Sequence, residues 1–228
     1  MSERSYHQYC PIAHALDLVG DRWALLIARD LLLGPRRYTD LRDALPGTGS
    51  NILTARLKAL EGAGVIRRRT LPPPAASTVY ELTPYGRGLE GVIVALGRWG
   101  VESLGAIQPG QIISPESVML AGRALVAALA PALGTARAEL RIADAVFSGV
   151  FGVRVADGEV VDVTREPADD VASPDLVVRT DVATLYDVAA GRISLHEAVA
   201  AGVVALEGTP AALATVGDRA DAAAHDCV

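Results

Sequence analysis

The sequence predicts an α+β protein of two domains. Residues 1–106 place apolar side chains at helical spacing and end in a strand–turn–strand pattern, whereas residues 112–228 alternate short strands with helices. The charge divides at the same place: residues 1–105 carry 13 Lys and Arg against 10 Asp and Glu, and residues 106–228 carry 8 against 17. The uncharged stretch GAIQPGQIIS, residues 105–114, fits a short linker between the two domains.

The composition excludes several classes of protein. Half of the 228 residues are hydrophobic, only 4% are aromatic, and the formal net charge is -6. No apolar run reaches the roughly 18–20 residues that span a bilayer, and the polar start MSERSYHQYC lacks the order of a signal peptide, so we expect a cytoplasmic protein. Cys10 and Cys227 form no C-x-x-C pair and the four histidines show no ligand spacing, so we expect no disulfide framework, metal site or cofactor.

Three helices are expected before residue 46. PIAHALDLVG has helical spacing and ends at Gly20, which suits a C-cap. Asp21 is the expected N-cap of DRWALLIARDLLLG, and the pair Gly34-Pro35 ends that helix. Thr39 is the expected cap of a short helix, TDLRDAL, that stops before a proline.

A fourth helix is expected over residues 50–61, and its two faces differ. Leu53, Leu57 and Leu60 fall on one edge of a helical wheel and predict the buried side. The opposite side is short, polar and free of acids until Glu61, which suits entry into the major groove of DNA. An ordinary solvated helix face is an equally open interpretation. The candidate DNA contacts on this helix are Ser50, Asn51, Thr54, Ala55 and Lys58.

A hairpin is expected directly after this helix. VIRRRTL and TVYEL have strand patterns, and the proline-rich PPPAAS separates them. Helices followed by an arginine-bearing hairpin predict a winged helix-turn-helix, in which Arg67, Arg68 and Arg69 reach phosphates or the minor groove. Because strand residues alternate faces, not all three arginines can point at DNA. The alternative is a charged strand edge that discourages aggregation.

The segment TPYGRGLEGVIVALGRWGVESL predicts one long helix over residues 84–104, with Thr83 as its N-cap. Its many apolar residues require packing either on the core of its own domain or on a second copy of the chain. A two-fold dimer suits a DNA-binding protein, because it reads two half-sites about 34 Å apart.

These stretches resemble the HxlR-type family of bacterial winged-helix regulators. The resemblance runs from CPIAHALDLVGDRWALLIARDLLLGPRRYTDLRDALPG through LTARLKALEGAGVIRR to YELTPYGRGL and RW. It implies a homodimeric transcription factor with a recognition helix at 50–61, a wing at 65–82 and DNA contacts from Arg36 and Arg37. It also implies a dimer interface built by the N-terminal helix and the helix after the wing. The interface residues would be Ile12, Leu16, Leu89, Ile93, Leu96 and Trp99.

Cys10 matches a cysteine that is common in the HxlR-type family and that senses oxidants or electrophiles in some members. A reactive cysteine needs a lowered pKa from a helix N-terminus or a nearby cation, and Cys10 directly precedes a helix. The alternative, which we prefer, is a small buried side chain that helps to seat that helix.

The second half predicts a small, mostly antiparallel sheet covered by helices. SPESVMLAGRALVAAL predicts a helix, AELRIA and DLVVRT predict strands, and Asp157-Gly158 predicts the turn of a hairpin. Ser194 and Glu197 form a capping box for the helix SLHEAVAAG. A last strand, VVALEG, precedes a final helix, TPAALATVGDRADAA.

The stretch DLVVRTDVATLYDVAAGRISLHEAVAAGVVALEGTPAALATV resembles the sterol carrier protein type 2-like fold. The resemblance implies an apolar cavity that holds a lipid-like ligand. Phe147, Phe151 and Tyr186 are candidate lining residues, although aromatic residues at such spacings are more often plain core. No nucleophile–base–acid set, phosphate loop or metal spacing is present, so we do not expect an enzyme.

The leading hypothesis is therefore a homodimeric regulator that binds an operator in double-stranded DNA and responds to an apolar small molecule. The alternative is a lipid-binding or transfer protein whose first domain serves mainly for dimerisation. An enzyme acting on an apolar substrate is a weaker third hypothesis, because only the implied cavity favours it.

Overall fold

The computed structural model describes residues 5–73, 76–108, 110–145, 147–165 and 173–209. The chain divides into two compact units, Met1–Leu96 and Gly97–Val228, here called the first and second unit. This boundary lies inside a helix, earlier in the chain than the proposed linker at 105–114. The final helix expected after residue 208 lies outside the described residues.

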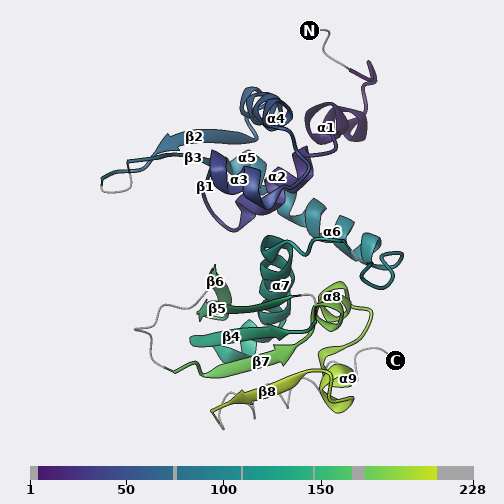
Figure 1. Ribbon diagram of the computed structural model, residues 1–228, viewed down its shortest axis with the longest axis vertical. Helices are drawn as coiled ribbons and strands as arrows, with labels where there is room; N and C mark the ends of the chain where they lie inside the picture. The colour runs from purple at the N-terminus through teal and green to yellow at the C-terminus, as the bar shows by residue number, and fades with distance from the viewer. Residues whose placement is uncertain (1–4, 74–75, 109, 146, 166–172, 210–228) are drawn as a thin grey trace. The chain divides into compact units, whose positions relative to one another are not determined.

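The first unit is a bundle of helices with one small sheet (Figure 1). Its elements, in chain order, are α1 Pro11–Val19, α2 Ala24–Leu32, β1 Arg36–Arg37, α3 Tyr38–Ala44, α4 Ser50–Gly62, β2 Ile66–Thr70, β3 Thr78–Leu82, α5 Pro84–Arg87 and the start of α6 Leu89–Val101. Its core is aliphatic, as the low aromatic content predicts, and its largest fully buried side chains are Ile27, Leu31, Leu41, Leu53, Leu57, Leu60 and Ile66.

Two of the predicted helix starts were wrong. α2 begins at Ala24 rather than directly after Asp21, and its N-cap position is Trp23. α3 begins at Tyr38, so Thr39 lies inside the helix rather than capping it. The carboxylate of Asp40 accepts a hydrogen bond from the backbone N–H of Arg37 at 2.8 Å, and this bond closes the first turn of α3.

The long helix expected over residues 84–104 is two helices. Thr83 caps α5 as predicted, since its Oγ1 accepts a hydrogen bond from the N–H of Gly86 at 3.0 Å. The same hydroxyl donates to the carbonyl oxygen of Gly64 at 2.6 Å, which ties α5 to the root of the hairpin. The helix breaks at Gly88, and α6 runs from Leu89 to Val101.

The sheet of the first unit has the order β1–β3–β2 with antiparallel neighbours. β2 and β3 form the predicted hairpin, which extends away from the helices in Figure 1. β1 was not predicted, because Gly34-Pro35 indicated only the end of a helix. It pairs Arg36 with Tyr80 and Arg37 with Val79, so a third strand fixes the base of the hairpin.

The second unit is built on a five-stranded sheet with the order β6–β5–β4–β7–β8. β4 and β7 are parallel, and the other three neighbouring pairs are antiparallel. Its elements after α6 are α7 Pro115–Leu133, β4 Ala136–Ala143, β5 Ser148–Ala156, β6 Glu159–Arg165, β7 Leu176–Thr180, α8 Val182–Ala190, α9 Leu195–Ala200 and β8 Ala205–Gly208.

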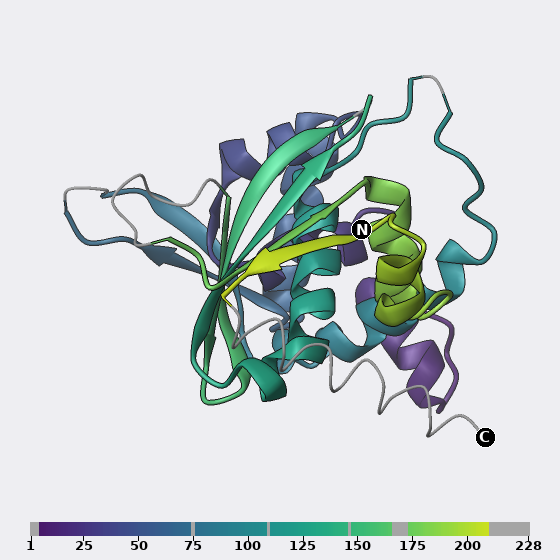
Figure 2. The ribbon, with the colours of Figure 1, turned by 90° about the horizontal axis from the view of Figure 1, so that it is seen from below.

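Helices lie on one face of this sheet (Figure 2). α7 packs against β4, β5 and β6, and a Cβ at Gly122 of this helix would overlap the side chain of Leu140. The other face of the sheet carries charged side chains that pair with one another. These ion pairs are Arg141–Glu139, Arg179–Glu207 at 2.8 Å and Arg154–Asp162 at 3.8 Å. The expectation of a sheet covered by helices is therefore met on one face, and the other face is polar.

Two local predictions for the second unit are confirmed. Asp157 and Gly158 join β5 to β6 with φ of 53° and 78°, as a two-residue hairpin turn requires. The Ser194 hydroxyl accepts from the N–H of Glu197 at 3.1 Å, and the Glu197 carboxylate accepts from the N–H of Ser194 at 2.8 Å. This reciprocal capping box begins α9.

The end of α6 belongs to the second unit, where Arg192 holds it. Nη1 of Arg192 donates to the carbonyl oxygen of Val101, the last residue of α6, at 2.7 Å. Nη2 of the same guanidinium lies 2.5 Å from the carboxylate of Asp187 on α8. Arg192 therefore gives the carbonyl oxygen of Val101 a second hydrogen bond, beside the one from the N–H of Leu104 at 3.2 Å.

Candidate nucleic-acid interface

The helix α4 has the two-sided character that its sequence predicts. Leu53, Leu57 and Leu60 are 0–2% exposed and fix the helix on the core. The opposite face is open to solvent and contains no acid until Glu61. Its exposed residues include all five candidate DNA contacts, Ser50, Asn51, Thr54, Ala55 and Lys58.

Tyr38 holds the first turn of α4. Its hydroxyl donates to the carbonyl oxygen of Ser50 at 3.2 Å and accepts a longer hydrogen bond from the Thr54 hydroxyl at 3.5 Å. A phenylalanine at this position would lack both hydrogen bonds. The tyrosine in GPRRY therefore orients the N-terminal part of the candidate recognition helix.

The middle of α4 is tied to the corner between α1 and α2. Arg56 pairs with Asp21 at 2.9 Å, and both side chains are little more than one-third exposed. Asp21 was expected to cap α2, and instead its carboxylate serves Arg56 and accepts from the N–H of Trp23 at 3.4 Å. Exposed pairs of this kind contribute roughly 0–1 kcal/mol each, so this pair orients α4 more than it stabilises the fold.

Arg67 and Arg69 lie on one face of the wing, the hairpin formed by β2 and β3, and share one acid. Glu81 on β3 is directly opposite Arg67. Its Oε1 accepts from Nε of Arg67 at 2.8 Å, and its Oε2 accepts from Nε of Arg69 at 3.0 Å. The side chain of Glu81 is 11% exposed, while those of Arg67 and Arg69 are 62% and 45% exposed.

The charged state of Glu81 is favoured despite its burial. Burial raises the pKa of this carboxyl group, but the hydrogen bonds from Arg67 and Arg69 outweigh it, and the pKa is held below its ordinary value. Glu81 is therefore ionised near neutral pH, and the cluster of two arginines and one acid carries a net charge of about +1.

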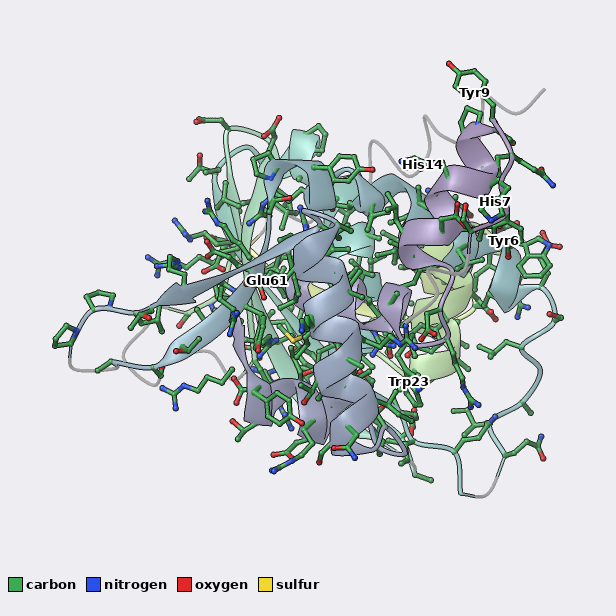
Figure 3. The ribbon with its side chains drawn as sticks, turned by 90° about the horizontal axis from the view of Figure 1, so that it is seen from above. Tyr6, His7, Tyr9, His14, Trp23 and Glu61 are labelled. Atoms are coloured by element: carbon green, nitrogen blue, oxygen red, sulfur yellow. The ribbon has the colours of Figure 1, made fainter. Side chains whose placement is uncertain are left out.

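Arg68 points to the opposite face, as strand alternation requires. Its Nε donates to Oε1 of Glu61 at 2.9 Å, and this hydrogen bond raises the pKa of the Arg68 guanidinium. Glu61 lies in the last turn of α4, where Figure 3 shows it beside the wing strands. The pair therefore links the candidate recognition helix to the wing.

Four further residues belong to this surface and were not predicted from the sequence: Glu61, Glu81, Tyr38 and Asp21. For Glu81 a signal was available, because the acid directly before the last residue of TVYEL falls opposite an arginine once the hairpin register is set. For Tyr38 and Asp21 no local signal exists, since their partners lie 12 and 35 positions along the chain. Of the other candidates, Arg37 is exposed and Arg36 is half-buried, both in β1.

Comparison with known proteins identifies the family. The family described as HxlR-like helix-turn-helix (HTH) matches residues 18–108. The HTH-type transcriptional regulator sll1512 of Synechocystis sp. is 40% identical over 95 residues, which are 42% of this chain and 70% of that protein. The chain belongs to the HxlR-like helix-turn-helix family. Regulators of this family bind DNA and typically dimerise.

Other transcriptional regulators are similar to a comparable share of the chain. The regulator YvaP of Bacillus subtilis is 33% identical over 96 residues, which are 42% of this chain and 89% of that protein. The solved structure of the reduced form of the regulator YodB from B. subtilis has 30% identity and a TM-score of 0.38, and it covers 46% of this chain and all of that one. These matches are to transcriptional regulators rather than enzymes, and the matched family ends before β4.

The apolar residues proposed for an HxlR-like dimer interface are mostly exposed. On α1, Ile12 is 71% and Leu16 is 45% exposed, and on α6, Leu96 is 46% and Trp99 is 70% exposed. Ile93 is buried and Leu89 is half-buried, so these two side chains pack mainly within the chain. In Figure 3 the segment that precedes α1 carries Tyr6 and Tyr9, which are also exposed.

Cys10 and the candidate ligand residues of the second unit occupy ordinary structural positions. Cys10 is half-buried at the N-cap of α1. Phe151 is fully buried and stacks on Phe147 with ring centroids 6.2 Å apart. The hydroxyl of Tyr186 shares a hydrogen bond of 2.7 Å with that of Ser117 on α7. These contacts show packing roles for the three aromatic side chains.

No metal site or membrane span accompanies this surface in the part of the chain that is described. No three His, Cys, Asp or Glu side chains gather there as metal ligands would. None of the helices there has the length and apolar character needed to cross a membrane.

Proposed function

We propose that this HxlR-like protein is a homodimeric transcriptional regulator that binds double-stranded DNA through α4 and the wing. The observation that carries the proposal is the combination on the first unit of an exposed face of α4 with no acid before Glu61 and a hairpin with three exposed arginines. α4 enters the major groove, where small side chains permit close approach and Asn51 and Lys58 address base edges or phosphates.

The modest charge of this surface favours a dimer. Asp21, Glu61 and Glu81 each pair with an arginine of α4 or of the wing, so the surface lacks a broad positive field. Two copies placed on half-sites about one helical turn apart supply the affinity that one copy lacks. The exposed apolar residues of α1 and α6 support this arrangement, because association would bury them.

DNA binding is tested by fluorescence anisotropy with promoter fragments and random duplexes at several salt concentrations. We expect affinity to fall steeply with salt and to favour particular fragments. Asn51→Ala should weaken binding to a preferred fragment by about 5- to 100-fold, and Lys58→Ala should reduce the salt slope by about one. The control Arg165→Ala removes a charge from β6 and should change neither. Salt-insensitive binding, or no preference among duplexes, would refute the proposal.

We further propose that an apolar small molecule in the second unit modulates DNA binding. The support is the sequence resemblance of residues 175–216 to sterol carrier-like proteins and the order strand, helix, helix, strand over its described part. A ligand can act on DNA binding only if it favours one arrangement of the dimer. The alternative of a lipid-binding or transfer protein receives no support from the relatives, which are transcriptional regulators.

Native mass spectrometry of the purified protein tests the ligand. We expect the dimer to retain an added mass that organic extraction removes, and the extracted protein to bind DNA with altered affinity. A dimer of bare protein mass whose DNA affinity does not respond to added apolar compounds would refute this part. The DNA-binding proposal would stand in that case.

A further inference from the structure

The wing contains an acid whose position DNA binding does not require. Glu81 is buried, although it lies on a hairpin that extends away from the helices. Both of its carboxylate oxygens accept hydrogen bonds, one from Arg67 and one from Arg69. A wing that served only to attract phosphates would gain affinity from a neutral residue at this position, because Glu81 removes one unit of positive charge from it.

The geometry of the pairing leaves both arginines able to contact DNA. Glu81 engages Nε and Nη2 of Arg67 and Nε of Arg69, and a guanidinium has five N–H donors. Nη1 of each arginine lies outside these contacts, and the two side chains remain about half exposed or more. The planar guanidiniums are therefore held by one edge, while the other edge is available to an acceptor.

Arg68 provides the contrast on the other face of β2. Its partner, Glu61, pairs with this single arginine and has a side chain that is 31% exposed, against 11% for Glu81. Glu61 also belongs to a different element, so it links α4 to the wing. Glu81 lies on the partner strand of the same hairpin, so it fixes the two arginines relative to each other.

We propose that Glu81 determines the sequence selectivity of the wing by holding Arg67 and Arg69 in one arrangement, an inference that rests on the proposed DNA binding. A fixed pair of guanidiniums binds well only where the width of a DNA groove brings acceptors to those positions, and groove width depends on sequence. The same carboxylate lowers the attraction to any other duplex, because it reduces the charge of the wing. Glu81 therefore weakens non-specific binding while it preserves binding at a matching site.

The experiment compares two duplexes of equal length, one selected from a random library by the wild-type protein and one of scrambled sequence. Glu81→Gln keeps the size of the side chain and removes its charge. We expect the scrambled duplex to bind more tightly and the ratio of the two affinities to fall about tenfold. The control Glu102→Gln makes the same charge change at an exposed residue after α6 and should leave the ratio unchanged.

A variant that lacks both arginines shows whether Glu81 acts by positioning them or by stabilising the fold. In Arg67→Gln/Arg69→Gln protein, addition of Glu81→Gln should leave the ratio unchanged, because no guanidinium remains to be held. The inference is overturned if Glu81→Gln lowers the ratio of the two affinities by less than threefold. It is also overturned if Glu81→Gln lowers that ratio equally in the protein that lacks both arginines. Wild-type protein that selects no duplex refutes the proposed function as well, whereas an unchanged ratio in selective protein refutes the inference alone.

Discussion

Trp99 offers the sharpest test of the proposed dimer. It lies on α6 and is 70% exposed, so it contributes little to the core of a single chain. A large aromatic side chain in this position is expected to become buried when a second copy packs on α6. Trp99→Ala should therefore weaken dimerisation while leaving the fold of the chain intact.

The magnitude follows from the exposed area. A tryptophan buries roughly 150–250 Å², so a side chain that is 70% exposed offers about 140 Å² to a partner. At about 25 cal/mol per Å², and with one copy from each chain, full burial is worth roughly 7 kcal/mol per dimer. Incomplete burial and the ordering of side chains reduce this to about half. We expect the dissociation constant to rise about 300-fold.

Analytical ultracentrifugation over a range of concentrations measures this constant, and circular dichroism checks the fold. The control Ile112→Ala removes an apolar side chain of equal exposure, 70%, from the segment between α6 and α7. We expect the control to associate as the wild-type protein does. Trp99→Ala protein that is folded and dimerises with unchanged affinity would show that α6 does not form the interface.

Two further predictions concern the wing and its root. Gly86→Ala places a Cβ against the carbonyl oxygen of Val65, so the melting temperature should fall by about 10 °C or more. In the control Gly91→Ala the new Cβ meets open space and should not lower the melting temperature. Equal melting temperatures for the two variants would disprove the clash. The pKa of the Glu81 carboxyl group is lower in the folded protein than in the unfolded chain. The ionised carboxylate therefore contributes fully to stability at pH values above its ordinary pKa of about 4.3, and this contribution is lost as the pH falls through the lower pKa of the folded state. Urea unfolding between pH 7 and pH 3 should show less acid destabilisation for Glu81→Gln than for the wild type, and parallel curves would contradict this reasoning.

Local chemistry explains which elements could be predicted from the sequence. The turn at Asp157-Gly158 was predictable because few residue pairs accept positive φ at both positions. The capping box of Ser194 and Glu197 was predictable because the two side chains satisfy each other's backbone within four residues. The buried edge of α4 was predictable because three leucines recur at helical spacing.

Elements that depend on distant partners were not predictable in this way. Asp21 is a good N-cap residue by type, but its carboxylate pairs with Arg56 on α4, and α2 begins later. The helix expected to continue from α5 breaks at Gly88, next to a segment in which Gly86 packs closely on Val65. Predicting that Arg67 and Arg69 share Glu81 requires the register of the hairpin, and the number of charges in the sequence does not give that register.

The guanidinium of Arg192 makes the end of α6 dependent on the loop between α8 and α9. Without that contact the carbonyl oxygen of Val101 would keep the hydrogen bond from the N–H of Leu104 at 3.2 Å, but the last turn of α6 would be held less firmly. Trp99 lies in that last turn, so in the proposed dimer any event that releases Arg192 would loosen the surface that a second copy contacts. Order in one short loop of the second unit would then favour assembly of the proposed dimer, with no change required in the helix-turn-helix itself.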